Sequence, residues 1–134
     1  MKILLDTHII LWYLNGDERL PQNARKIIDD SKNEIYFSLV SIWEVEIKHI
    51  SHPDKMVSSG DEVIAKCGRA EFKELGLNSI HIKTLHTLHR LETAPKHNDP
   101  FDRMLIAQAK AEEMTFLTHD LLLPYYNEPC VLSV

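Results

Sequence analysis

Short strand-like runs alternate with longer helical segments along the chain, and this alternation limits its fold more than any other feature. Five runs rich in apolar or β-branched residues are predicted strands: 2–5, 34–40, 78–82, 115–120 and 130–134. Helical spacing of apolar residues predicts helices at 8–14, from Pro21 onward, from Ser41 to Ile50, and at 59–74, 83–91 and 97–114. Strands that alternate with helices in this way form a mainly parallel sheet with helices on both faces. We therefore expect one α/β domain that covers residues 1–134.

Composition narrows the class of protein. No apolar run approaches the roughly 18 residues that a membrane span needs, and Cys67 and Cys130 are too few for a disulfide framework. We expect a cytoplasmic protein without a membrane partner. The formal net charge is −5, which lacks the basic footprint of a general nucleic-acid binder. It does not exclude an enzyme that handles a phosphodiester through bound metal, because the acids that hold the metal contribute to the negative charge.

Four acidic residues, far apart in sequence, are expected at one edge of the predicted sheet. Asp6 ends the first strand, and Asp120 ends the run at 115–120. Glu44 and Asp102 fall in the first turns of the helices that begin near Ser41 and at 97. The carboxyl ends of parallel strands share one edge, and ligands of such sheets bind there. The topology alone therefore brings these four carboxylates together.

Each of these acids also has a purely structural interpretation. Ser41 and Glu44 match a helix capping box, and Asp99 before Pro100 matches a helix cap. Asp6 and Asp120 match strand-end turn residues. Four carboxylates within about 4–6 Å, however, repel by roughly 4 kcal/mol per close pair at an effective dielectric constant near 20. A helix N-terminus offsets only about 0.3–1 kcal/mol, so the cluster predicts a divalent cation.

The ligand types favour a particular class of metal. Carboxylate oxygens, without cysteine or an organised histidine pair, suit Mg²⁺ or Mn²⁺. Such an ion polarises a phosphoryl oxygen and activates water for in-line attack. The sequence thus favours a metal ligand over a cap for Asp6.

Several neighbours of these acids have two open interpretations. Thr7 and Thr118 carry hydroxyls beside site acids and either orient a carboxylate or make a turn hydrogen bond. Arg103 and Lys48 are the nearest basic candidates for phosphate contact, although Lys48 lies four residues after Glu44 and also fits a helical ion pair. Three histidines adjoin site motifs, and only their position suggests RNA contact: His8, His97 and His119. The aromatic residues Trp12, Trp43 and Phe101 are expected to pack in the core or at a dimer interface.

Four stretches of the chain resemble the PIN-domain family, and most closely the VapC-type toxins of type II toxin–antitoxin systems. They are "LLDTHIILW", "SIWEVEIK", "HNDPFDRMLIAQA" and "TFLTHD", in the family's order. The resemblance implies an α/β/α fold with strand order 3-2-1-4-5 and a Mg²⁺- or Mn²⁺-dependent endoribonuclease. It also implies a homodimer that is neutralised by a small VapB-type antitoxin, whose tail reaches the active site.

Carried over by motif, the catalytic metal ligands are Asp6, Glu44, Asp102 and Asp120. "DPFD" offers both Asp99 and Asp102, three residues apart on one helical face. Asp102 precedes "MLIAQA" at the family's usual distance and is taken as the ligand. Asp99 is then the helix cap, near enough to act through the ligand.

Other functions fit the same pattern less well. A haloacid-dehalogenase phosphatase needs a second Asp two residues after its nucleophile, where this chain has His8. A receiver domain needs an acid pair at the end of the first strand and a central phospho-acceptor, and neither is evident. A non-catalytic interaction module has no need of acids at all four positions. A related metal-dependent DNase would share the site, and only the small size and the lack of a basic extension favour RNA.

Overall fold

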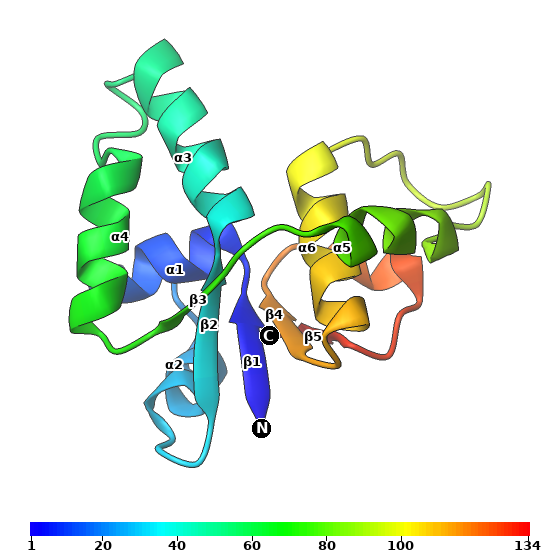
Figure 1. Cartoon of the computed structure of the whole chain (residues 1–134), viewed down its shortest axis with the longest axis horizontal. Coiled ribbons are helices and arrows are strands. Elements are labelled where there is room, and N and C mark those ends of the chain that lie inside the picture. The colour runs from blue at the N-terminus through cyan, green and yellow to red at the C-terminus, as the bar shows by residue number, and fades with distance from the viewer.

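The computed structural model describes residues 1–134 and shows a three-layer α/β/α arrangement (Figure 1). The strands are β1 (Lys2–Leu5), β2 (Glu34–Ser38), β3 (Lys73–Leu75), β4 (Thr115–Thr118) and β5 (Val131–Ser133). The helices are α1 (Thr7–Leu14), α2 (Gln22–Asp29), α3 (Leu39–Ser51), α4 (Gly60–Arg69), α5 (Ser79–Thr84) and α6 (Pro100–Ala111). Two short 3₁₀ helices complete the chain, η1 (Leu85–Thr87) and η2 (Leu123–Tyr126). None of these helices has the length and apolar character that crossing a membrane requires.

The sheet has five strands in the order β3-β2-β1-β4-β5, and every neighbouring pair is parallel. This confirms the predicted α/β fold class and strand order. β1 lies in the centre, with Ile3 opposite Ile35 of β2 and opposite Thr115 of β4. The chain leaves β1 at Asp6 and β4 two residues before Asp120, so both acids lie at the same edge of two adjacent strands.

The strands bury apolar side chains on both faces of the sheet, and their sequences are therefore almost continuous hydrophobic runs. Ile3 and Leu5 point to a core shared with α1, α2, α3 and α4. Leu4 points the other way, to a second core formed by α6, η2 and neighbouring side chains. In Figure 1 these helices lie on opposite sides of the sheet, and α3 rises from the carboxyl end of β2.

The predicted strand at 78–82 is wrong, because these residues form most of helix α5. The Asn78 side chain accepts hydrogen bonds from the backbone N–H groups of Ile80 and His81, and His81 Nδ1 accepts from Asn78 N, which makes a capping box. Ile80 and Ile82 alternate as in a strand, yet they are 61% and 51% exposed. The third strand of the sheet is instead Lys73–Leu75.

The start of α3 also differs from its prediction. The strand expected over 34–40 ends at Ser38, whose hydroxyl accepts a hydrogen bond from Val40 N and caps a helix that begins at Leu39. The expected capping box of Ser41 and Glu44 is therefore wrong, and Glu44 lies in the second turn rather than the first. The early start aligns Ser41 and Glu44 toward α1 instead.

The other differences concern boundaries. The helix expected over 59–74 ends at Arg69, and that expected over 97–114 ends at Ala111. Glu71 and Glu113 follow with positive φ values of 63° and 55°, which a helix does not accommodate. The helix expected over 83–91 is also shorter, because residues 83 and 84 end α5 and only Leu85–Thr87 form η1. Pro21 is the cap residue of α2 rather than its first turn.

Candidate metal centre

Asp6 connects β1 to α1 and is 4% exposed. Its Oδ1 accepts a hydrogen bond of 2.7 Å from Thr7 N, and its Oδ2 accepts one of 2.6 Å from the Thr118 hydroxyl on β4. Burial raises the pKa of this carboxyl, although the hydrogen bonds from Thr118 and Thr7 act in the opposite direction. Asp6 is thus both the cap residue of α1 and a buried acid at the sheet edge.

Glu44 extends from α3 toward α1 and is 3% exposed. Its Oε1 lies 2.7 Å from the Thr7 hydroxyl, which also lies 2.9 Å from the Ser41 hydroxyl. A hydroxyl has one hydrogen, so Thr7 donates to Glu44 and accepts from Ser41. Thr7 therefore links the two acids, since its N–H binds Asp6 and its side chain binds Glu44.

Lys48 forms the helical ion pair with Glu44, with 2.6 Å between Nζ and Oε2. Burial lowers the pKa of Lys48, but the hydrogen bond to Glu44 and the charges of Asp99 and Asp102 outweigh this effect, and the pKa is raised. Lys48 is the cation that partly balances the cluster. Arg103 is exposed and lines a different surface hollow with Leu85 and His86, so the structure does not bring it among the carboxylates.

Asp102 lies in the first turn of α6, whose start is capped by Asp99. The Asp99 carboxylate accepts hydrogen bonds from Phe101 N and Asp102 N at 2.9 and 3.2 Å, and Pro100 takes the first helical position. Burial raises the pKa of Asp102 to about 8, and the charges of Asp6, Asp99, Glu44 and Asp120 add to this rise. The Asp102 carboxyl therefore interacts electrostatically with every other acid of the predicted site.

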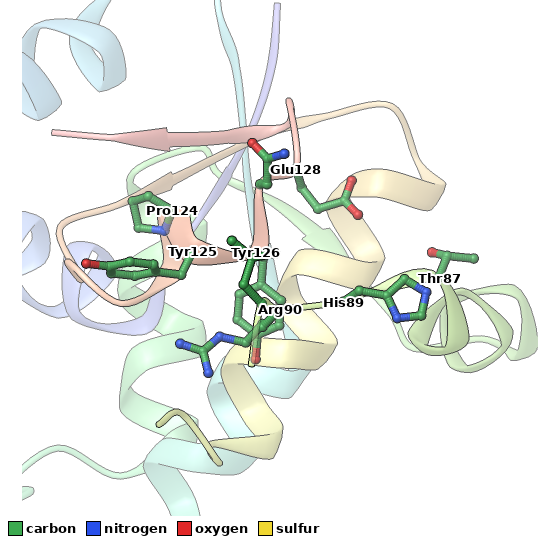
Figure 2. A pocket seen from close by; sticks show the side chains of 9 residues that line it. Thr87, His89, Arg90, Pro124, Tyr125, Tyr126 and Glu128 are labelled. Carbon is green, nitrogen blue, oxygen red and sulfur yellow. The ribbon is translucent and has the colours of Figure 1, made fainter. Parts of the chain in front are cut away.

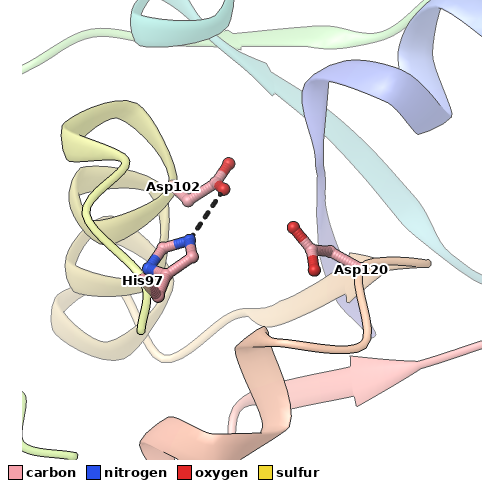
Figure 3. Close-up of side chains that lie close together, drawn as sticks. All are labelled: His97, Asp102 and Asp120. Carbon is pink, nitrogen blue, oxygen red and sulfur yellow. Dashed lines mark hydrogen bonds and ion pairs between the residues drawn. The ribbon is translucent and has the colours of Figure 1, made fainter. Parts of the chain in front are cut away.

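His97 holds the Asp102 side chain from the other direction. Its Nε2 lies 3.1 Å from Asp102 Oδ2 (Figure 3). Its Nδ1 lies 2.8 Å from the Tyr126 hydroxyl on η2. Burial lowers the pKa of His97 and raises that of Tyr126, so the imidazole is neutral and the phenol protonated at pH 7. Tyr126 then donates to Nδ1, and Nε2–H donates to Asp102.

Asp120 completes the cluster at the end of β4. Its backbone N–H donates to the Thr118 hydroxyl at 3.0 Å, and its Oδ1 accepts from Leu122 N at 2.8 Å. Its carboxylate faces that of Asp102 (Figure 3). His97, Asp102 and Asp120 each offer one ligand atom, and these atoms lie within 4.8 Å of one another.

This donor set fits a hard divalent cation. The donors are carboxylate oxygens, because both nitrogens of His97 are used in hydrogen bonds, and no thiol takes part. The raised pKa of Asp102 means that this carboxyl retains a proton near neutral pH unless a positive charge replaces it. Asp6 and Asp120 also line an opening of about 250 Å³, so solvent reaches the cluster.

Some features of the site escaped the sequence interpretation. His97 was singled out only by its place in "HNDPFD", and nothing in the sequence linked it to Tyr126, 29 residues later. Trp43 is not core packing, since it is 58% exposed and meets Phe101 edge to face, with 5.1 Å between ring centroids. Trp12 instead packs partly against the core of α1 and α2.

The sequence profile of the PIN domain family matches residues 3–126, nearly the whole chain. The chain belongs to the PIN domain family. PIN domains are generally nucleases that depend on divalent metal ions. The acidic cluster of this PIN domain is accordingly a candidate metal centre.

Two solved structures share this PIN fold. One is VapBC2 from Rickettsia felis bound to a DNA fragment from its promoter, with a TM-score of 0.67, 15% identity, and coverage of 100% of this chain and 98% of that chain. The other is FitAcB from Neisseria gonorrhoeae, with a TM-score of 0.61, 18% identity, and coverage of 98% and 96%. No curated protein sequence matches significantly. At these identities the structures support the fold alone.

Proposed function

We propose that the chain is a Mg²⁺- or Mn²⁺-dependent endoribonuclease, formed by one PIN nuclease domain over residues 1–134. The observation that carries this proposal is the Asp102 carboxyl, whose pKa is raised to about 8 by burial and by four neighbouring acids. Such crowding costs stability in a protein that binds no cation. It is expected where a doubly positive ion is bound.

Asp6, Glu44, Asp102 and Asp120 would hold the ion. A divalent ion bound there supplies positive charge that orients water and the phosphodiester and offsets the charge that develops during in-line attack. The other residues act on these carboxylates. Thr118 and Thr7 fix Asp6, Thr7 and Lys48 fix Glu44, and His97 fixes Asp102. Asp99 keeps the start of α6 in place, which aims Asp102 at the sheet edge.

RNA is proposed as the substrate rather than DNA, because the four motifs of the chain most closely resemble those of the VapC-type toxins, and this resemblance implies an endoribonuclease. Lys48 and Arg103 are the proposed phosphate contacts, Lys48 from its position beside Glu44 and Arg103 from the exposed side of α6. A phosphotransfer function is less well supported, because His8 stands where a phosphatase would need its second Asp. His8 instead lines the opening beside Asp6 and Asp120.

The proposed biological role is that of a cytoplasmic toxin whose partner is a VapB-type antitoxin and which forms a homodimer. The VapC-like motifs and the fold shared with VapBC2 support this role. An apolar stripe on α3 supports a protein partner, because Trp43, Ile47 and Ile50 follow one helical face and Ile50 is 74% exposed.

The test is cleavage by the purified protein of end-labelled single-stranded RNA and of the same sequence as DNA. We expect RNA cleavage with Mg²⁺ or Mn²⁺, none in excess chelator, and recovery when the ion is returned, with an unchanged circular dichroism spectrum throughout. Asp102→Asn should be inactive. Cleavage in chelator by protein free of contaminating nuclease would rule out the metal mechanism. Preferential cleavage of DNA would show that the substrate is DNA rather than RNA. Sequencing of RNA ends after brief induction in cells then identifies the target.

A further inference from the structure

A cavity of about 630 Å³ lies next to the acidic cluster, between the segment after η1 and helix η2 (Figure 2). Its volume falls within the roughly 300–1,000 Å³ of typical ligand pockets. In Figure 2, Arg90 and Tyr126 lie between Tyr125 on one side and His89 and Thr87 on the other. The two sides of the cavity therefore come from segments that are about one quarter of the chain apart in sequence.

Tyr126 connects this cavity to the acidic cluster. The residue is 3% exposed, it lines the cavity, and its hydroxyl lies 2.8 Å from His97 Nδ1. His97 in turn contacts Asp102. Two side chains thus separate the cavity from a carboxylate of the candidate metal centre.

The cavity offers a cation without a carboxylate partner. The Arg90 guanidinium lies 5.2 Å from the centre of the Tyr126 ring, and one terminal nitrogen donates to the Pro95 carbonyl. Its Nε is buried and has no hydrogen-bond partner. The acid in the lining, Glu128, is already paired with Lys110 at 2.9 Å. Although the net charge of the chain is −5, Arg90 gives this cavity a positive group that can bind an anion.

The cavity also offers an exposed aromatic face and free polar groups. Tyr125 is 47% exposed, although its neighbour Tyr126 is buried. His89 and Asn127 are exposed in the same lining. Aromatic rings of this kind stack on unpaired bases, and arginine contacts the phosphate.

We propose that this cavity is a subsite for one nucleotide of a single-stranded RNA, adjacent to the phosphodiester that the acidic cluster cleaves. The base stacks on Tyr125 and the phosphate contacts Arg90. This inference rests on the proposed endoribonuclease function and names where its substrate binds.

The first test measures binding without cleavage, by fluorescence anisotropy of a fluorescein-labelled random single-stranded RNA on protein that carries Asp6→Asn. Adding Tyr125→Ala should weaken binding about tenfold, whereas Tyr125→Phe keeps the ring and should stay within about twofold. Arg90→Gln should lower the slope of log affinity against log salt by about 0.7. Arg69→Gln, at the end of α4 in the other half of the fold, is the matched control and should change neither value.

Two further readouts separate the subsite from other effects. Without Asp6→Asn, all of these variants should bind Mn²⁺ like the parent protein and melt within a few degrees of it. In cleavage assays, Tyr125→Ala should raise KM, and an abasic nucleotide at one position beside the cleaved bond should reproduce that loss. Combining the abasic RNA with Tyr125→Ala should add little, because both remove the same stacking contact.

The outcomes distinguish this proposal from the proposed function. If the parent protein cleaves RNA while Tyr125→Ala and Arg90→Gln leave affinity and KM unchanged, the subsite is overturned and the nuclease stands. If these variants weaken binding as expected but the parent protein cleaves no RNA, the binding site stands and the nuclease is overturned. An equal loss in Arg69→Gln would show general charge attraction and would overturn the subsite.

Discussion

At the scale of single residues, the acids of the cluster differ in what else each of them does. Asp6 accepts two hydrogen bonds from protein groups and is almost fully buried. Asp99 is occupied by two backbone N–H groups of α6. Asp102 has one partner, the imidazole of His97, and is surrounded otherwise by acids. Substitutions at these positions should therefore have separable effects.

Asp6→Asn should abolish cleavage and raise the melting temperature of the metal-free protein. Asn keeps an acceptor for Thr7 N and removes a buried charge, which relieves repulsion on the order of 1 kcal/mol. Asp6→Ala is the control, because it loses both hydrogen bonds and should be less stable than Asp6→Asn. Thermal unfolding in chelator measures both. A lower melting temperature for Asp6→Asn would show that Asp6 serves mainly as a cap.

Asp102→Asn and Asp99→Asn should differ in kind. Asp102→Asn should remove activity and most Mn²⁺ affinity, measured by calorimetry, at nearly unchanged stability. Asp99→Asn should be mild in both assays, because Asn caps a helix about as well as Asp. The opposite ranking would exchange the two roles, and equal severe losses would make both acids metal ligands.

At the scale of elements, the sequence predicted what depends on local pattern and topology. Asp6 and Asp120 could be placed together because every strand of a parallel sheet ends at the same edge. Strand identity failed at 78–82, where Ile80 and Ile82 imitate a strand but Asn78 and His81 cap a helix. Here a side-chain capping box outweighed the alternation of apolar residues.

Neither the helix start at Leu39 nor the contact of His97 with Tyr126 could be predicted from the sequence, and the reasons differ. Ser38 and Ser41 are equally good caps in isolation, and only the register of β2 decides between them. The contact of His97 with Tyr126 depends on how η2 folds back beside α6, which no local pattern records.

The hydrogen bonds that connect Tyr126 on η2 to His97, and His97 to Asp102 on α6, give a prediction at this scale. Tyr126→Phe removes the hydroxyl that donates to His97 Nδ1 but keeps the ring that Arg90 covers. The imidazole is then free to change tautomer or rotate. Because Tyr126 acts on the ligand Asp102 only through His97, we expect a loss in metal affinity or cleavage that is smaller than the roughly 10- to 100-fold typical of a direct partner of a ligand. Mn²⁺ titration of both proteins measures it. Unchanged affinity and activity would show that His97 needs no support from η2.

At the scale of the whole molecule, the two apolar cores hold the sheet edge rigid while the acids oppose one another across it. The pKa of Asp102 in the folded protein is about 8, whereas its ordinary value is 3.8. Between these two pH values the folded state therefore keeps a proton on Asp102 that the unfolded state has released. Stability that depends on this proton is present below about pH 4 and is lost as the pH rises toward 8.

The metal-free protein should accordingly become less stable from pH 5 to pH 8, by at most about 1.4 kcal/mol per pH unit for this group. Asp102→Asn should flatten that dependence, and saturating Mg²⁺ should restore the melting temperature of the parent protein most strongly at pH 8. Melting curves at a series of pH values, with chelator and with Mg²⁺, measure both effects. A parent protein whose metal-free stability rises over this interval would contradict the crowding of its acids.

The four carboxylates are synthesised in two stages, because Asp6 and Glu44 lie early in the chain and Asp102 and Asp120 lie much later. The first part of the chain, through β2 and α3, can begin to pair and pack while only two of the acids exist. Neither the mutual repulsion nor the ability to hold an ion is complete until β4 has inserted beside β1. For the proposed endoribonuclease, this means that a nascent chain cannot cleave RNA before β4 has joined the sheet beside β1.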